Sequence, residues 1–417
     1  MKKIYTNALM LLAPFGMAVF AQNNAITVNK GQLYVLPNTL IATHANFENR
    51  NSGIVFNDGE FQFYKNYTNN GLFTHTTSKT TGYTVFQGNQ EQLIAGEQPS
   101  KHFDVLFNNS VAFFNLNSDI IINGTGNFNN GIVKINNANG GQMMFGNNAK
   151  QINASDKSYA QGMVEKQGAN AFTFPIGKEG FYRMAAISAP ENTNALYTSE
   201  YFIANTNNMY PHKDKTGIIE AVDNAEYWQI NKADATTGSV IVTLSWHQQT
   251  TPAAFSNNAN LHVVRWDAKQ NLWVDEGGIV DMNAKTITTP VNVEGFGIFT
   301  IGKIKEKYNN PGDVVIYNGV SADNDGVNDY FIIDNINYFP DNSVTIFNRW
   351  GRKVFETTNY NSNGNVFKGY VSTNQTTNTK EKLPSGTYYY VVEYLYNRNG
   401  ENKLIKKVGH LHLENNN

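Results

Sequence analysis

The 417-residue chain contains no cysteine. Thiol catalysis and cysteine-ligated zinc are therefore excluded, and without disulfides the fold must be held by its core, by bound ions or by stacked repeats. Charged residues are also scarce, at 16% of the chain, and the formal net charge is only −2. Because no run of basic residues is present, the sequence predicts binding neither to nucleic acid nor to an acidic membrane surface.

Motifs of common catalytic sites are missing as well. The sequence has no Gly-x-Ser-x-Gly, no His-Glu-x-x-His and no Gly-x-x-x-x-Gly-Lys-Ser/Thr, which mark serine hydrolases, zinc proteases and phosphate-binding loops. We therefore expect a protein that is not an enzyme. Two alternatives stay open: a glycosidase-like pair of carboxylates far apart in the sequence, and sugar stacking on tryptophans whose alternating positions favour the core for most of them. These tryptophans are Trp228, Trp246, Trp266 and Trp273.

The residues that are abundant favour β-structure. Aromatic residues reach 13% and the chain holds 34 glycines; aromatics suit strands, and glycine and asparagine suit tight turns. At the N-terminus, Lys2 and Lys3 precede an apolar run from Ala8 to Phe20, and small residues end at Ala21. This pattern predicts a cleaved signal peptide over residues 1–21, and hence export.

Residues 22–155 consist of short apolar runs separated by Asn-Gly and Asp-Gly. The segment 46–49 (NFEN) recurs at 66–69 (NYTN) and again at 127–130 (NFNN), each followed by a glycine and an apolar pair. We interpret these as copies of one unit in a β-solenoid with a period near twenty residues, one inward aromatic per coil and stacked asparagines at the turns. The alternative is an antiparallel sandwich with Asn-Gly hairpins.

The strands predicted in residues 156–303 are longer. Alternation in 238–246 (GSVIVTLSW) places one apolar face against a core, and the short strands between turn-rich stretches favour a β-sandwich. Residues 304–312 lose this pattern and are predicted to be a linker.

Residues 313–417 again alternate as strands. After a turn at 383–386 (LPSG), Tyr388, Tyr390 and Val392 share one face of a strand, opposite Tyr389 and Val391. We expect a compact, Ig-like β-sandwich here, so the whole chain is predicted to be all-β.

Three motifs of this last region carry a resemblance. In this order and spacing, 317–336 (YNGVSADNDGVNDYFIIDNI), 339–356 (FPDNSVTIFNRWGRKVFE) and 383–394 (LPSGTYYYVVEY) resemble the gliding-motility-associated C-terminal domain of Bacteroidetes, the type B sorting domain of the type IX secretion system. The resemblance covers about residues 313–413. It departs from the family at the end, where Glu414 and an asparagine tail replace the expected basic residue.

This resemblance implies a route and partners. The signal peptide would take the chain to the periplasm. The sorting domain would bring it to the type IX translocon and to an outer-membrane β-barrel shuttle or anchor protein, and another secreted surface protein is a further candidate partner. The chain is thus expected at the cell surface, associated with the outer membrane, or outside the cell. We expect a structural, anchoring or adhesion-related component linked to gliding motility. The alternatives are a carbohydrate-binding adhesin module and a polysaccharide-active enzyme.

The acidic segment 321–331 (SADNDGVNDYF) is the one candidate metal site. It cannot be an EF-hand loop, because Ser321 and Ile332 occupy the first and twelfth ligand positions when Asp325 and Gly326 are aligned. A looser oxygen cage for Ca²⁺ remains open, beside the alternative of a tight turn that needs no cofactor. The cage would be formed by Asp323, Asp325, Asn328 and Asp329.

A second candidate is the turn around Trp350, flanked by Arg349 and Arg352. Aromatic and arginine side chains often anchor protein partners, so these three residues are predicted to take part in partner recognition. In the alternative, Trp350 caps the core and the arginines lie over its ring.

Overall fold

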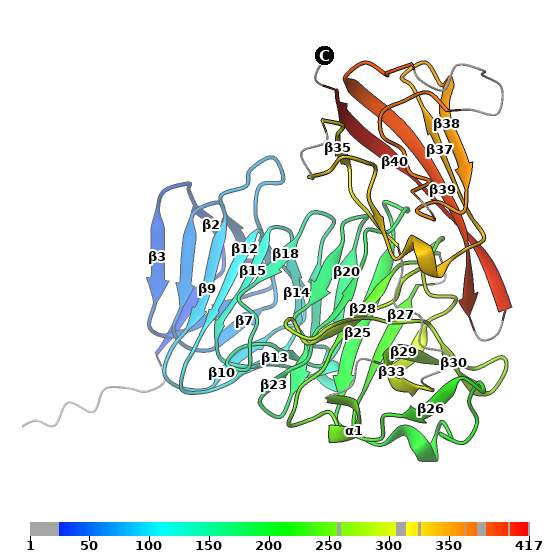
Figure 1. The fold of residues 1–417 in the computed structure, drawn as a ribbon. Coiled ribbons are helices and arrows are strands. Elements are labelled where there is room, and N and C mark those ends of the chain that lie inside the picture. The colour runs from blue at the N-terminus through cyan, green and yellow to red at the C-terminus, as the bar shows by residue number, and fades with distance from the viewer. Residues whose placement is uncertain are drawn as a thin grey trace, which may run out of the picture.

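The computed structural model describes residues 25–233, 235–256, 260–305, 314–323, 327–362, 364–372, 381–398 and 401–415. Strands make up 51% of the chain and helices 4%. Figure 1 shows a solenoid in blue and cyan, a sandwich in green, and a C-terminal domain in orange and red that stands above the sandwich. The predicted all-β fold with an N-terminal solenoid is confirmed.

The solenoid has about seven coils, and its strands stack into three parallel sheets, one for each side of the coil. Parallel pairing between successive coils excludes the alternative of an antiparallel hairpin sandwich. The first side is formed by β1 (Ile26–Asn29), β4 (Asn46–Asn49), β7 (Tyr67–Asn69), β10 (Gln92–Ala95), β13 (Phe114–Asn117), β16 (Val133–Ile135) and β19 (Ala160–Gln161). The second side is formed by β2 (Gln32–Val35), β5 (Ile54–Asn57), β8 (Leu72–Thr74), β11 (Ser100–His102), β14 (Asp119–Ile122), β17 (Gln142–Phe145) and β20 (Val164–Gln167). The third side is formed by β3 (Leu40–Thr43), β6 (Glu60–Phe63), β9 (Tyr83–Gln87), β12 (Asp104–Asn108), β15 (Thr125–Asn130) and β18 (Lys150–Ile152).

Asparagines stack at one corner of the coil, as expected. The Nδ2 of Asn29 donates to Oδ1 of Asn49 at 2.9 Å, and the Nδ2 of Asn49 donates to Oδ1 of Asn69 at 2.8 Å. The same Asn49 amide also donates to the Leu72 carbonyl at 3.1 Å. Because a buried amide needs partners for both its donor and its acceptor, this ladder fixes the phase in which successive coils stack.

Aromatic rings fill the interior of the solenoid. Phe47 and Tyr67 face each other across successive coils with ring centroids 5.8 Å apart, and Phe63 stacks on Phe86 at 5.6 Å. All four side chains are buried. Since each coil covers the apolar side chains of its neighbour, the stack supplies the core that a single coil lacks.

One part of the repeat assignment is wrong. The segments 46–49 and 66–69 are equivalent, since they form β4 and β7 and pair residue for residue. The segment 127–130 instead belongs to β15, on the third side of the coil. The three corners of a coil all use asparagine and glycine, so sequence similarity alone does not tell which side of the coil a segment occupies.

The sandwich grows directly out of the solenoid. Parallel pairing continues past the predicted boundary at residue 155, to β20, which then pairs antiparallel with β25 (Leu196–Phe202). The second side of the solenoid thus becomes one thirteen-stranded sheet, and a single hydrophobic core runs through both regions. Its remaining strands are β26 (Ile219–Val222), β27 (Tyr227–Lys232), β29 (Leu261–Asp267), β30 (Leu272–Asp275) and β33 (Gly297–Ile304).

A second sheet of five strands covers this extension. It consists of β21 (Phe172–Phe174), β24 (Ala185–Ile187), β28 (Val242–Ser245), β31 (Ile279–Asp281) and β32 (Thr286–Thr288). Small elements connect the strands: the hairpin of β22 (Gly177–Lys178) and β23 (Phe181–Tyr182), the helix α1 (Ala253–Ser256), and the 3-10 turns Asn137–Asn139 and Thr206–Asn208. Trp228, Trp246 and Trp273 are buried, in keeping with the prediction that most of these tryptophans belong to the core.

A charged cluster lies inside the sandwich. The Arg183 guanidinium donates to both carboxylate oxygens of Glu226, at 3.1 and 2.7 Å, and to the Ser245 carbonyl at 2.7 Å. Tyr201 donates its hydroxyl to the same carboxylate at 2.5 Å. Arg183 and Glu226 are almost completely buried, so each depends on the other for compensation of its charge.

The C-terminal domain has a core of its own. A five-stranded sheet contains β35 (Gly319–Ser321), β37 (Asn342–Phe347), β38 (Lys353–Thr358), β39 (Gly386–Arg398) and β40 (Glu401–Glu414). A second layer comprises the pair β34 (Val315–Ile316) and β36 (Ile333–Asp334) and the 3-10 turn Ile336–Tyr338. Tyr388, Tyr390 and Val392 are buried on one face of β39 while Tyr389 is exposed, as the alternation predicts.

The predicted signal peptide (1–21) lies outside the described residues, as does most of the predicted linker (304–312). In the part of the chain that the structure describes, no helix is long and apolar enough to cross a membrane.

Candidate functional site

The described residues of the acidic segment, 321–323 and 327–331, form the two ends of a turn at the entry of the C-terminal domain. The Ser321 amide donates to the Asn328 carbonyl at 2.8 Å, which brings the two ends of the turn together. The Ser321 hydroxyl donates to the Asp323 carboxylate at 3.1 Å. Asn328 has a positive φ of 55°, a conformation that asparagine tolerates better than most residues. These contacts join the described ends of the segment, whereas Asp325 and Gly326, on which the alternative of a tight turn depends, lie outside the described residues.

The four predicted calcium ligands are therefore only partly placed. Asp323, Asn328 and Asp329 lie in this turn, whereas Asp325 lies outside the described residues. Within the described part, no group of three or more His, Asp or Glu side chains is arranged to hold a metal ion. The calcium site stays a prediction.

The turn around Trp350 connects β37 to β38. Asn348 organises it: its side-chain oxygen accepts from the amides of Trp350 at 3.1 Å and Arg352 at 2.9 Å. The Asn348 amide donates to the Arg352 carbonyl at 2.9 Å, and Gly351 provides a positive φ of 75°. The turn backbone is thus held by hydrogen bonds of its own, without help from the Trp350 side chain.

Trp350 does not cap the core. Its side chain is 74% exposed, and the Arg349 guanidinium carbon lies 4.2 Å from the ring centroid. The cation–π contact of the alternative interpretation is present, but it forms at the surface. An exposed tryptophan on a rigid turn, with Arg349 and Arg352 beside it, presents a preformed contact surface to a partner.

The family of this domain is shown by a match to known sequences. Residues 314–413 match the model of the CHU_C type IX secretion signal domain. The C-terminal region is a type IX secretion signal domain. It implies interaction with the type IX secretion machinery and export toward the cell surface or the extracellular space. No curated protein and no solved structure matches the chain.

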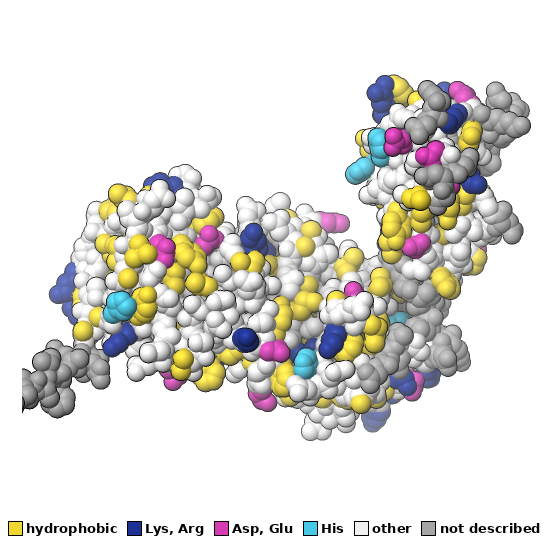
Figure 2. Space-filling view, turned by 60° about the vertical axis from the view of Figure 1, so that its left-hand side comes forward, with side chains coloured by type: hydrophobic (Ala, Val, Ile, Leu, Met, Phe, Trp, Pro, Cys, Tyr) yellow, Lys and Arg dark blue, Asp and Glu magenta, His cyan; other side chains and the backbone are white. Residues whose placement is uncertain are grey.

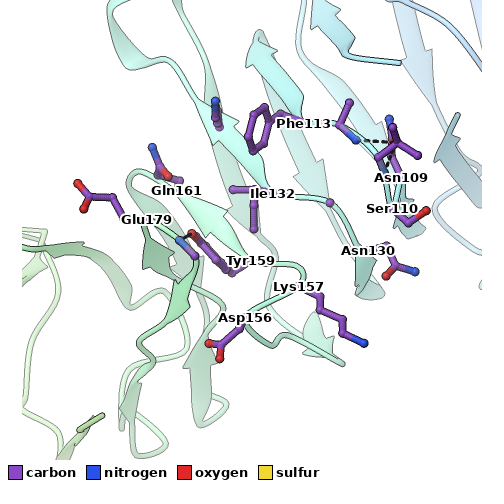
Figure 3. A pocket seen from close by; sticks show the side chains of 15 residues that line it. Asn109, Ser110, Phe113, Asn130, Ile132, Asp156, Lys157, Tyr159, Gln161 and Glu179 are labelled. Carbon is purple, nitrogen blue, oxygen red and sulfur yellow. Dashed lines mark hydrogen bonds between the residues drawn. The ribbon is translucent and has the colours of Figure 1, made fainter. Parts of the chain in front are cut away.

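A groove of about 770 Å³ lies on the first side of the solenoid, where the solenoid meets the sandwich. It crosses three successive coils, at Phe113, Ile132 and Tyr159, and the turn of the β22–β23 hairpin closes one end (Figure 3). Phe113 is 42% exposed, and the Lys134 amine lies 3.4 Å from its ring centroid.

Most polar side chains around this groove come from loops and outward strand positions. Lys134 and Gln161 are neighbours on adjacent strands β16 and β19, and both point outward from the coil. Tyr159 is buried and its hydroxyl accepts from the Gly180 amide at 2.7 Å; burial raises the pKa of this hydroxyl. Asp156 accepts from the Tyr182 amide at 2.8 Å. Both of these groups therefore hold the hairpin against the solenoid.

The sequence did not reveal this groove. Its aromatic, Phe113, lies in an apolar stretch (VAFF, 111–114) that reads as an ordinary strand. In the structure Phe114 points into the core whereas Val111 is 70% exposed. Apolar residues such as Val111 and Phe113 are unusual in a corner loop, and this could have pointed to a binding surface. The groove itself is created only by the packing of the sandwich hairpin against the solenoid.

Proposed function

We propose that this protein is a non-catalytic surface component that is exported across the inner membrane by its signal peptide and then delivered to the cell surface by its C-terminal domain. The observation that supports this proposal most directly is the type IX secretion signal domain at residues 314–413. The solenoid and sandwich are the cargo, an elongated body joined through one continuous sheet. Such a body suits a structural, anchoring or adhesive role, linked to the gliding machinery and retained at the outer membrane.

The partner in this proposal is an outer-membrane β-barrel protein of the secretion system that acts as shuttle or anchor. The exposed Trp350 turn supports the assignment, since aromatic and arginine side chains dominate binding energies at protein interfaces. The separate core of the domain also supports it, because a folded domain with its own core can be recognised as a unit.

Export of the chain tests this proposal directly. In a host with a type IX system, the full chain should become accessible to protease added to intact cells, and a chain that ends at residue 305 should stay in the periplasm. A fusion of residues 304–417 to an exported reporter should carry the reporter to the surface. A reporter that stays in the periplasm would contradict the proposal.

A second candidate function is carbohydrate binding in the groove of the solenoid. The groove has the size of a ligand site, and it offers an exposed aromatic, Phe113, beside the outward amide of Gln161 and the amine of Lys134. An amide and an amine can hydrogen-bond the hydroxyls of a saccharide, and an aromatic ring can stack on its apolar face. A glycan array probed with the full chain and with Phe113→Ala tests this: binding that Phe113→Ala abolishes supports an adhesin, and silence of the array counts against it.

A polysaccharide-active enzyme is the less favoured alternative. Asp156 and Glu179 both line the groove, but the Asp156 carboxylate serves the backbone of the sandwich hairpin. Release of reducing ends from polysaccharides by the full chain, lost in Asp156→Asn and in Glu179→Gln, would favour the enzyme over the surface component.

A further inference from the structure

The five-stranded sheet of the signal domain has one buried face and one open face. Tyr388, Tyr390, Val392 and Leu411 point into the domain core and are at most 7% exposed. On the opposite face, residues of the same two strands are strongly exposed. Tyr389 is 49% exposed, Leu404 62% and Val408 66%.

Strand register brings apolar residues together on this outward side. Phe347 lies opposite Tyr389, Val391 lies opposite Val408, and Leu395 lies opposite Leu404. Directly opposed side chains on one face of an antiparallel pair are in contact distance. We call these six residues the open apolar face. In Figure 2, hydrophobic side chains gather on the C-terminal domain below histidine side chains.

This arrangement departs from what a one-sided sheet normally shows. An antiparallel sheet with one face in water alternates apolar residues inward with polar residues outward. The strands β37 and β38 follow that rule at Ser343, Thr345 and Glu356, and depart from it at Phe347. The central strands β39 and β40 do not, since their outward positions include the exposed residues of the open apolar face. Contiguous exposed apolar side chains on a soluble domain mark interaction surfaces.

Charged and polar groups surround the open apolar face. Lys353 lies beside Phe347, and His410 lies opposite Tyr389. Glu393 and Lys406 form an ion pair at 2.9 Å that crosses the face between Val391 and Leu395. The ion pair thus separates Leu395 and Leu404 from the other four residues of the face. Apolar groups mixed with charged and polar ones are typical of a protein–protein interface rather than of a lipid-facing surface.

The turn of Trp350 lies next to one end of this surface. It begins directly after Phe347, and its indole is 74% exposed. We propose that the open apolar face and Trp350 together form the docking surface through which a protein of the type IX secretion machinery binds this domain. The inference rests on the proposed function, and it adds which face of the domain the partner binds. The occupant follows from the domain itself: a secretion signal must be bound by a protein of that machinery, and the opposite face of the sheet is filled by the core.

A matched pair of double variants of the full chain tests the inference. The face variant carries Tyr389→Ser and Val408→Lys. The control variant carries Tyr34→Ser and Val111→Lys, on the solenoid, where the same residue types are 54% and 70% exposed. Each chain is expressed in a host with a type IX system, and the surface fraction is measured by protease added to intact cells. Thermal unfolding of the purified proteins checks that each variant folds.

The wild-type chain and the control variant should reach the surface equally, and the surface fraction of the face variant should fall more than fivefold with folded protein left in the periplasm. Export of the folded face variant at the wild-type level would overturn the inference. If the face variant does not fold, Val408→Lys alone decides in the same way, since a single lysine at a two-thirds exposed position is tolerated in a strand. A purified wild-type chain that is dimeric, and monomeric in the face variant, would assign the surface to a second copy and also overturn the inference. Failure of the wild-type chain to leave the periplasm would instead contradict the proposed function.

Discussion

The asparagine ladder at the corner of the solenoid predicts that Asn49→Ala is among the most destabilising substitutions of a small polar residue in this chain. Asn49 is fully buried and takes part in three hydrogen bonds, with Asn29, Asn69 and the Leu72 carbonyl. The substitution removes all three and leaves buried partners behind. At about 1 kcal/mol for each lost bond, the free energy of unfolding should fall by about 3 kcal/mol.

A second substitution at the same position separates hydrogen bonding from volume. Asn49→Asp keeps the size of the side chain and its acceptor, but it loses both donors and places a carboxylate next to the Leu72 carbonyl. It should therefore destabilise the protein at neutral pH at least as much as Asn49→Ala, and part of the loss should be recovered in acid, where the carboxyl group is protonated and can donate. A volume effect alone would spare Asn49→Asp.

Urea denaturation followed by circular dichroism measures these changes, with Asn129→Ala as control. Asn129 is an exposed asparagine of the same solenoid that donates a single hydrogen bond to Asn108 at 3.0 Å. Its replacement should change the free energy of unfolding by less than about 0.5 kcal/mol. If Asn49→Ala and Asn129→Ala cost the same, the ladder does not stabilise the solenoid in the way described.

Three further predictions concern buried ionisable groups. Burial lowers the pKa of His102 to about 3, so its contribution to stability is fully present above about pH 6.5 and is lost as the pH falls toward 3, by about 3 kcal/mol at pH 4.5. This loss should be absent in His102→Leu but present in a His44→Leu control when urea midpoints are compared across pH. Burial and the neighbouring Glu226 raise the pKa of Asp223 to about 8, so its contribution to the free energy of unfolding is present in acid and is lost as the pH rises from about 3.8 through 8. Asp223→Asn should remove this loss of stability at rising pH, and an unchanged pH profile of stability would contradict the assignment. Arg183→Met leaves the buried Glu226 carboxylate without its cationic partner, with only hydroxyl donors such as Tyr201, and should cost about 3–5 kcal/mol. The double variant with Glu226→Gln should recover a large part of this loss; equal losses in the single and double variants would show that packing, not charge, is responsible.

Much of the fold was predictable because it depends on short-range rules. The asparagine corners of the solenoid follow from the twenty-residue recurrence between Asn49 and Asn69, and the alternation around Tyr388 and Tyr389 identified the buried face of β39. The place of the NFNN segment at 127–130 was not predictable, because every corner of a coil makes the same demands on the backbone. The sequence also gave no sign that the solenoid and the sandwich share one sheet, since this depends on β20 accepting an antiparallel neighbour.

The candidate sites were likewise only partly predictable from the sequence. The motif around Trp350 was evident from the chain, but its exposure was not, because a tryptophan between arginines fits a core cap and a surface anchor equally well. The groove beside Phe113 could not be predicted from the sequence, because its walls come from a solenoid loop and from the β22–β23 hairpin, which follows nearly seventy residues later in the chain.

By itself the sequence determined the all-β class, the repeat with its asparagine ladder and the type IX secretion signal domain, because each is encoded by residues close together in the chain. Only the tertiary structure decided which apolar side chains stay in water. Alternation along β39 and β40 assigns two faces to a strand, but it does not say whether the second face is covered by another layer. In this domain the described second layer covers the tyrosine-rich inner face, whereas Tyr389, Leu404 and Val408 of the open apolar face remain exposed, as does Trp350.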